Sequence, residues 1–261
     1  MQITSWNAFK LSLGIYLMGY WFSTISFQTP LFVYFNESSL TPVGWWLWLE
    51  DHQLLSPYLF ILAFSCLGLV ITKLTRITAI FNLINLLLLY RFTNGLLISP
   101  STPFLGWCLL WLSFFPQELK SSDKFIWWIL LATGYFCSGL GKALSSIWTN
   151  GDAVALLSMS PSSVIKISFD NFIVLKKIMT FSTLIVELLG IFIIWMDWGR
   201  KLYWYLLILF NLGIVLLMNV PEVGLLMLII NLALWEDSPS LKCLYSKFSI
   251  LYNTFNKKKD L

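Results

Sequence analysis

The sequence predicts an all-α protein, a polytopic integral membrane bundle of about eight transmembrane helices. Of the 261 residues, 58% are hydrophobic and only 11% are charged, and the mean hydropathy is +0.76. A chain this apolar has too little polar surface for a water-soluble domain. Aromatic residues make up 17% of the chain and include 14 tryptophans, and such rings gather at the two faces of a membrane. We therefore expect a multi-pass protein of the cell membrane, in contact with membrane lipids.

Apolar runs separated by polar turns define the expected spans in the first half of the chain. The first span covers 7–27, and Lys10 near its start is expected to reach the lipid headgroups. The segment 45–52 is too short to cross and is acidic at its end, so we expect it to lie at one membrane face. Three further spans are short for an untilted helix. These spans are 57–71, 77–92 and 103–115.

The second half of the chain contains a central span at 125–145 and a short amphipathic helix at 151–161. Pro161 ends that short helix. Three more spans follow, at 172–195, 203–218 and 222–235. We expect one transmembrane domain over residues 1–240 and a basic tail over 241–261. The lysines at 257, 258 and 259 suit the tail to anionic headgroups on the cytoplasmic face.

The distribution of positive charges predicts the orientation. Eight spans place both termini on the same side of the membrane, and lysine and arginine favour the cytoplasmic side. With alternate loops assigned to the cytoplasm, that side holds twelve of the 17 basic residues. We therefore expect both termini to be cytoplasmic and Lys142 to lie toward the outer face. The outer side then holds Arg91, Lys142, Lys166, Lys176 and Lys177.

Few side chains in this sequence suit metal chemistry. The only histidine, His52, lies in an expected loop, which excludes a histidine metal cluster and disfavours a Ser-His-Asp triad. The four cysteines, at 66, 108, 137 and 243, show no metal-ligand spacing and are expected to be small buried hydrophobic residues. We expect no metal and no nucleic-acid partner.

Lys142 is the most unusual residue in the expected spans. It lies near the end of the 125–145 span, where burial of an ammonium group in hydrocarbon costs a few kcal/mol. Tyr135, Ser138 and Gly139 fall on the same helix face as Lys142. Small residues let a neighbouring helix approach closely, so Lys142 should point into the bundle.

Glu187 is a second charged residue within a span. A buried acid is either neutral or paired with a cation, and Lys142 or Arg91 is the candidate partner. Lys142 in turn could pair with Glu187 or Glu222. Two interpretations of the pair stay open, a structural ion pair and a catalytic base with a proton relay.

Other polar residues complete the candidate site. Asn82 and Asn85 lie three apart on one face of the 77–92 span, where interhelical hydrogen bonds of about 0.6 kcal/mol each explain them. Asp152 is expected to cap the short helix after Trp148. An outward-facing cavity is expected near Lys142, with Lys142 and Glu187 as catalytic residues. The expected substrate-binding residues are Asn85, Arg91, Tyr135, Trp148, Asn211 and Glu222.

The stretch Gly134-Tyr-Phe-Cys-Ser-Gly-Leu-Gly-Lys142, followed by Trp148 and Gly151, resembles a region shared by the horizontally transferred transmembrane (HTTM) family. That family includes the vitamin K-dependent gamma-carboxylases and the bacterial sporulation-delaying protein B group. A more distant likeness is to the DoxX quinone-associated proteins. Two later stretches, 183–190 and 210–222, agree with the family in helix order, so the likeness covers most of the chain.

The resemblance implies that Lys142 acts as a base toward a quinone or quinol cofactor. A lysine withdrawn from water can become a neutral amine that accepts a proton from a quinol hydroxyl. HTTM proteins often have histidine where this chain has Asn211, and asparagine cannot serve as a general base. The resemblance also implies a bacterial setting and a role in maturation of a secreted peptide. The alternative is a non-enzymatic membrane partner, an immunity protein or complex subunit, in which Lys142 and Glu187 only join helices.

Overall fold

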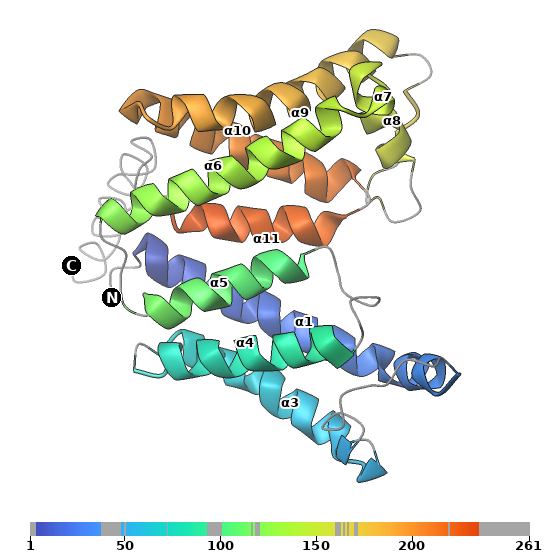
Figure 1. Cartoon of the computed structure of the whole chain (residues 1–261), viewed down its shortest axis with the longest axis vertical. Coiled ribbons are helices and arrows are strands. Elements are labelled where there is room, and N and C mark those ends of the chain that lie inside the picture. Colours follow the sequence, from blue (N-terminus) through green and yellow to red (C-terminus); the bar gives the residue numbers. More distant parts are fainter. Residues whose placement is uncertain are drawn as a thin grey trace, which may run out of the picture. The chain divides into compact units, whose positions relative to one another are not determined.

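A computed structural model of the chain is built of helices (Figure 1). It describes residues 4–37, 48–49, 51–71, 73–92, 101–115, 117, 121–159, 163, 165, 167–169, 172–218 and 220–234, with the backbone alone at 25–37, 91, 92 and 121. Every regular element among these residues is helical, which confirms the all-α class. The tail 241–261, and with it Lys257 to Lys259, lies outside the described residues, as do 45–47 and 50 of the 45–52 segment.

The helices group into two compact units. One unit, residues 6–119, contains almost all of α1 (Ser5–Glu37) and the three helices that follow. These are α3 (Leu55–Ser65), α4 (Thr75–Phe92) and α5 (Thr102–Phe114), with the short 3₁₀ helix η1 (Cys66–Leu69) between α3 and α4. The single domain expected over 1–240 stays a prediction.

A buried polar cluster around Asn82 of α4 joins three helices of this unit. The Asn82 Oδ1 accepts a hydrogen bond from Trp21 Nε1 of α1 at 2.8 Å, and the Asn82 Nδ2 donates to Ser65 Oγ of α3 at 3.0 Å. Asn82 Nδ2 also donates to the Thr78 carbonyl oxygen at 3.0 Å. Asn82 and Trp21 are fully buried. The predicted interhelical role of Asn82 is therefore confirmed.

The other unit, residues 120–261 with the first five residues, contains the central helix of the sequence and those after it. Helix α6 packs along α9, while α10 packs against both α9 and α11. The short helices α7 and α8 connect α6 to α9 at one end (Figure 1). The bounds are α6 (Ser121–Ala143), α7 (Ser146–Thr149), α8 (Ala153–Ser158), α9 (Ile173–Ile193), α10 (Asp197–Leu217) and α11 (Pro221–Leu232).

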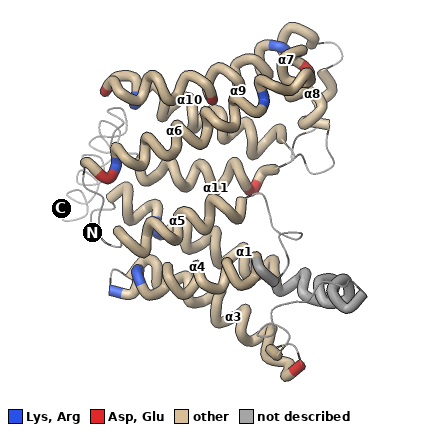
Figure 2. Tube along the Cα trace, viewed as in Figure 1, with Lys and Arg blue, Asp and Glu red and all other residues tan. Residues whose placement is uncertain are grey.

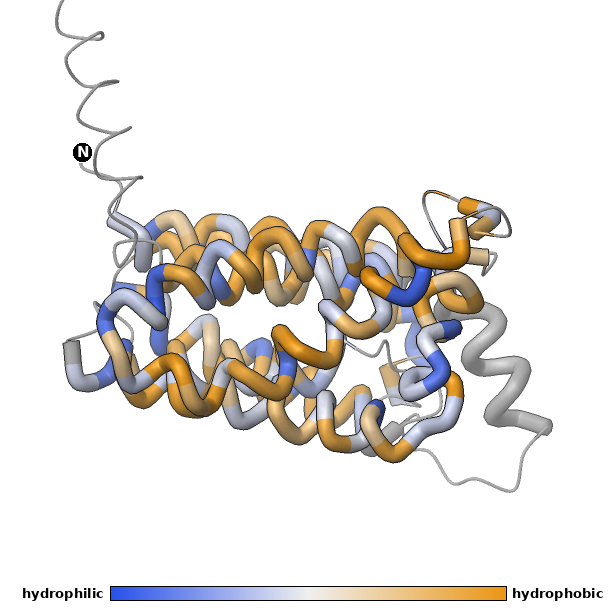
Figure 3. Tube along the Cα trace, turned by 90° about the horizontal axis from the view of Figure 1, so that it is seen from above, coloured by the Kyte–Doolittle hydropathy of each residue, from blue (hydrophilic) through white to orange (hydrophobic). Residues whose placement is uncertain are grey.

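One helix among the described residues, α10, is both long and apolar enough to cross a membrane. Four shorter apolar helices cover Leu55–Leu69, Thr75–Tyr90, Thr102–Phe114 and Pro221–Leu232. Charged residues lie mostly near helix ends (Figure 2), and hydrophobic residues cover the helices along their lengths (Figure 3). This pattern is consistent with membrane association, and the arrangement with eight spans stays a prediction.

Three expectations need correction. Helix α1 does not end at residue 27 but continues through Pro30 to Glu37, although a proline in a helix interior removes one backbone hydrogen bond and crowds the preceding turn. Lys10 does not extend outward as expected, since it is only 1% exposed and has an interaction partner. Cys137 is exposed rather than buried.

Glycines mark the closest approaches between helices of the second unit. A Cβ atom built on Gly190 of α9 would lie 2.2 Å from the Tyr203 hydroxyl oxygen of α10 and 2.3 Å from Cζ of the same ring. Tyr203 is fully buried, so its ring cannot move aside without repacking the core. By contrast, a Cβ atom on Gly134 of α6 would meet nothing within 4 Å. Gly190 is thus required by packing, whereas Gly134 is not.

We expect Asn82→Leu to lower the free energy of unfolding by about 1–3 kcal/mol. The substitution leaves the buried Trp21 N–H without its acceptor and Ser65 without a donor. Ser113→Ala is the matched control, because Ser113 Oγ donates only to the Leu109 carbonyl oxygen of its own helix at 2.8 Å. Thermal or denaturant unfolding of the purified proteins measures both, and equal losses in the two variants would contradict the role given to Asn82.

We expect Gly190→Ala to lower the free energy of unfolding by about 1–3 kcal/mol, because the new methyl group overlaps the Tyr203 ring. Gly134→Ala should instead be neutral or stabilising by up to about 1 kcal/mol, since alanine is the better helix former. The same unfolding measurement compares the two variants. A Gly190→Ala protein as stable as Gly134→Ala would show that α9 and α10 do not approach as described.

Candidate functional site

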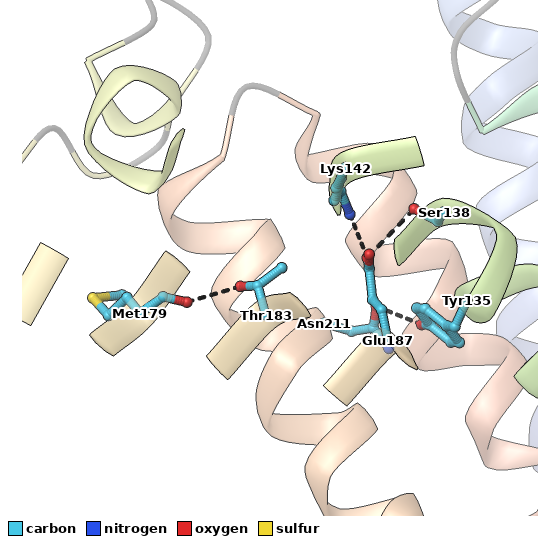
Figure 4. A network of polar contacts seen from close by, with 7 residues as sticks. All are labelled: Tyr135, Ser138, Lys142, Met179, Thr183, Glu187 and Asn211. Carbon is cyan, nitrogen blue, oxygen red and sulfur yellow. Dashed lines mark hydrogen bonds and ion pairs between the residues drawn. The ribbon is translucent and has the colours of Figure 1, made fainter. Parts of the chain in front are cut away.

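Six of the predicted site residues belong to the unit formed by residues 120–261. Five of them form the candidate site, and these five come from four helices. Tyr135 and Lys142 lie on α6, Trp148 on α7, Glu187 on α9 and Asn211 on α10. Four of them appear with their polar contacts in Figure 4. They form two adjoining groups, an ion pair around Glu187 and a hydrogen-bonded pair around Asn211.

The ion pair joins α6 to α9. Lys142 Nζ donates to Glu187 Oε1 and forms a salt bridge with it, and Ser138 Oγ donates to the same oxygen at 3.5 Å (Figure 4). The Glu187 side chain is only 2% exposed, whereas that of Lys142 is 24% exposed. A buried carboxylate thus holds an amine that is itself partly accessible.

The second carboxylate oxygen of Glu187, Oε2, lacks the hydrogen-bond donors that Oε1 has. Glu187 Oε2 is buried, and no donor among the described residues forms a hydrogen bond with it. A buried acceptor without a donor is destabilising by about 1–3 kcal/mol, so this atom is suited to a proton or to a hydrogen-bond donor. The two oxygens of this carboxylate are therefore in unequal surroundings.

The local sequence of α6 explains why Glu187 fits here. Ser138 and Lys142 lie four residues apart, which places them one above the other on one helix face. Gly139, on the same face, lets α9 approach, because a Cβ atom there would lie 3.0 Å from Glu187 Cβ and 3.1 Å from Leu188 Cγ. The prediction that Lys142 points into the bundle beside small residues is confirmed.

Trp148 covers the amine on its other side. The Lys142 Nζ lies 5.0 Å from the centroid of the Trp148 ring, within the range of a cation–π interaction. Trp148 belongs to α7, which begins directly after α6. The Lys142 nitrogen therefore interacts with both the Glu187 carboxylate and the aromatic face of Trp148.

The second group lies beside the Glu187 side chain (Figure 4). The Tyr135 hydroxyl donates to Asn211 Oδ1 at 2.9 Å, and Asn211 Nδ2 donates to the Leu207 carbonyl oxygen at 2.8 Å. Tyr135 and Asn211 are both buried. The hydrogen bond between Tyr135 and Asn211 thus joins α6 to α10.

The remaining predicted site residues lie elsewhere. Asn85 of α4 belongs to the other unit, where its Oδ1 accepts a hydrogen bond from the Tyr58 hydroxyl at 2.5 Å and its Nδ2 donates to the Phe81 carbonyl oxygen at 2.8 Å. The side chain of Arg91, also on α4, is outside the described residues. Glu222 lies in the first turn of α11, where a negative charge suits the helix dipole.

Sequence reasoning missed three features of this unit. Ser138 lies on the predicted helix face, but its spacing alone does not identify it as a partner of Glu187. The contact of Tyr203 with Gly190 has no sequence signal beyond a glycine one turn after Glu187. Asp152 does not cap α8 with its side chain; it forms an ion pair with Lys176 of α9 at 2.6 Å, a partner too distant in sequence to infer.

Comparisons with models of protein families, with curated proteins and with solved structures gave no match. The likeness to the HTTM family therefore rests on the residues quoted from the sequence and stays a prediction.

Proposed function

We propose that the chain is a multi-pass protein of a bacterial cell membrane, with both termini in the cytoplasm. Support comes from the apolar α10 and from the outward faces of the other helices. On α9, Val174, Ile178, Ile185 and Phe192 are each more than half exposed. Side chains of this kind suit acyl chains rather than water. In the proposed orientation Lys142 lies in the outer half of the bilayer.

We propose further that Lys142 and Glu187 form an acid–base centre of the HTTM, gamma-carboxylase-like type. The observation that supports this best is the difference in exposure within the pair. The Glu187 carboxylate is buried, whereas the Lys142 amine is partly accessible. Intramembrane charges are costly and are usually kept for function. The buried Glu187 Oε2, which has no hydrogen-bond donor among the described residues, adds a position for a proton.

The substrate class that fits this centre is a quinone-like lipid. When bound, a quinol supplies a weakly acidic hydroxyl group on a flat ring. Trp148 presents an aromatic face beside Lys142, and the partly accessible Lys142 amine offers a polar contact for a hydroxyl group. These features fit a flat protic headgroup that enters from lipid.

The two side chains can prepare a base without any further group. Transfer of one proton from the Lys142 ammonium group to the Glu187 carboxylate leaves a neutral amine beside a neutral acid, with no net change of charge. The amine nitrogen can then accept one proton from an acidic hydroxyl. In the proposed setting this step serves the maturation of a secreted peptide.

The second candidate function is that of a non-enzymatic membrane partner, an immunity protein or complex subunit. The observation that favours it is the close packing at Gly139, where α6 and α9 meet directly at Glu187. In that case the Lys142–Glu187 pair only fixes how the two helices associate. Substitutions of Lys142 and Glu187 distinguish the two functions.

We expect Lys142→Met to abolish peptide processing in the source cell while membrane yield stays close to that of the wild type. Methionine keeps most of the side-chain volume but has no basic nitrogen. Glu187 can respond to the loss of its partner by taking up a proton. Processing activity and yield are measured in parallel for Lys142→Met and for the double variant Lys142→Met/Glu187→Leu.

The structural function gives a different result for these variants. There, Lys142→Met should lower the stability, and with it the membrane yield, because the contact that joins α6 to α9 is lost, and processing should fall only as far as the yield does. The double variant should then recover both, since an apolar pair can replace a buried ion pair. Recovery of processing together with stability in the double variant would rule out the acid–base function.

We expect a quinone to co-purify with the wild-type protein and to be reduced several-fold in Lys142→Met. The lysine provides the polar contact that retains the headgroup, while the apolar surface around it is unchanged. Extraction of bound lipids followed by mass spectrometry measures the quinone content per mole of protein. Gly134→Ala serves as the control, and equal content in all three proteins would argue against a quinone site at Lys142.

A further inference from the structure

Residues 151–154, which follow α7, contact α9 through an ion pair and hydrogen bonds. Asp152 Oδ1 forms an ion pair with Lys176 Nζ at 2.6 Å. Thr180 Oγ1, one turn along α9, accepts a hydrogen bond from the Val154 N–H at 3.3 Å. Its one hydroxyl hydrogen is shared between the Gly151 carbonyl oxygen at 3.2 Å and the Lys176 carbonyl oxygen of its own helix at 3.0 Å. Thr180 is fully buried. The contacts that reach beyond α9 therefore fall on residues 151–154, directly after α7.

The backbone at Gly151 allows this close contact. Gly151 has a φ angle of +85°, a conformation that L side chains rarely adopt. A Cβ atom at this position would also lie 2.8 Å from Lys177 Cγ of α9. The turn therefore lies directly against α9, and only glycine satisfies both conditions.

The same turn is connected to Trp148 by backbone hydrogen bonds. The Gly151 N–H donates to the Trp148 carbonyl oxygen at 3.2 Å, and the Asp152 N–H donates to the Ile147 carbonyl oxygen at 3.1 Å. Trp148 is thus held between the end of α6 and the attached turn. Its ring lies over Lys142 Nζ as a result of both connections.

We propose that Thr180, Asp152 and Lys176 are positioning residues that hold Trp148 over the Lys142 amine and so control access to it. This inference deepens the proposed function, because it assigns the residues that define one wall of the site. Thr180 is the main anchor, since its bonds are buried. The Asp152–Lys176 pair is partly exposed, with side chains 45% and 21% accessible, and contributes less because solvent screens it.

The test is the rate at which acetic anhydride acetylates Lys142, measured by mass spectrometry on the full chain in detergent. The exposed Lys201 serves as the internal reference. We expect Trp148→Ala to raise the Lys142 rate several-fold relative to Lys201, Thr180→Val to raise it nearly as much, and Asp152→Asn or Lys176→Met to raise it less. Thr180→Ser should restore the wild-type rate, because it keeps the hydroxyl group.

Two matched controls separate this effect from general loosening of the unit. Thr183→Val removes a hydroxyl one turn away that donates to the Met179 carbonyl oxygen of its own helix at 3.0 Å. Asp197→Asn breaks the ion pair with Arg200 at the start of α10. Neither should change the Lys142 rate. Should Thr180→Val fail to fold, Asp152→Asn and Lys176→Met test the same anchor.

The proposal would be overturned if Lys142 were acetylated no faster in Thr180→Val than in Thr183→Val. If Thr180→Val does not fold, the deciding comparison is Asp152→Asn with Asp197→Asn, and equal acetylation rates of Lys142 in these two variants would overturn the proposal. An unchanged rate in Trp148→Ala would also overturn it, since the ring would then not cover the amine. Acetylation needs no natural ligand, so the result is independent of quinone binding. Failure of the proposed function would appear instead as unchanged quinone content in Lys142→Met.

Discussion

The ion pair between Lys142 and Glu187 is the constraint on which the unit of residues 120–261 depends. A carboxylate that is 2% exposed is tolerated in an apolar core only with a cation or a proton. This requirement fixes which face of α6 meets α9 and how far along each helix the contact lies. Gly139 provides the space for that contact. The packing of the two helices and the chemistry of the site therefore have the same origin.

Access to polar groups decreases from one side of this site to the other. Lys142 is partly accessible, whereas Glu187, Tyr135 and Asn211 are all buried, and Tyr135 donates a hydrogen bond to Asn211. The Tyr135–Asn211 pair supports the helices and keeps Glu187 away from solvent. Such an order suits proton transfer at the rim of a dry core.

Much of the helical structure could be predicted from the sequence, because long apolar runs between charged turns leave few alternatives. The predicted start of α10 at residue 203 is wrong, since the helix begins at Asp197, where an acid in the first turn and its ion pair with Arg200 stabilise an earlier start. The sequence leaves the partner of Glu187 open between Lys142 and Arg91, and only the packing of α6 on α9 decides it. Helical spacing could identify the face containing Lys142, but it has no information on contacts across loops. The pairing of Asp152 with Lys176 is of that kind.

The contact of Tyr203 with Gly190 has a consequence for how this protein can change over evolutionary time. The tyrosine ring occupies the volume that any larger side chain at position 190 would need. A substitution at one position is therefore acceptable only with a compensating substitution at the other. In an alignment of homologues, residues 190 and 203 should vary together, and their joint history would trace the contact between α9 and α10 through the lineage.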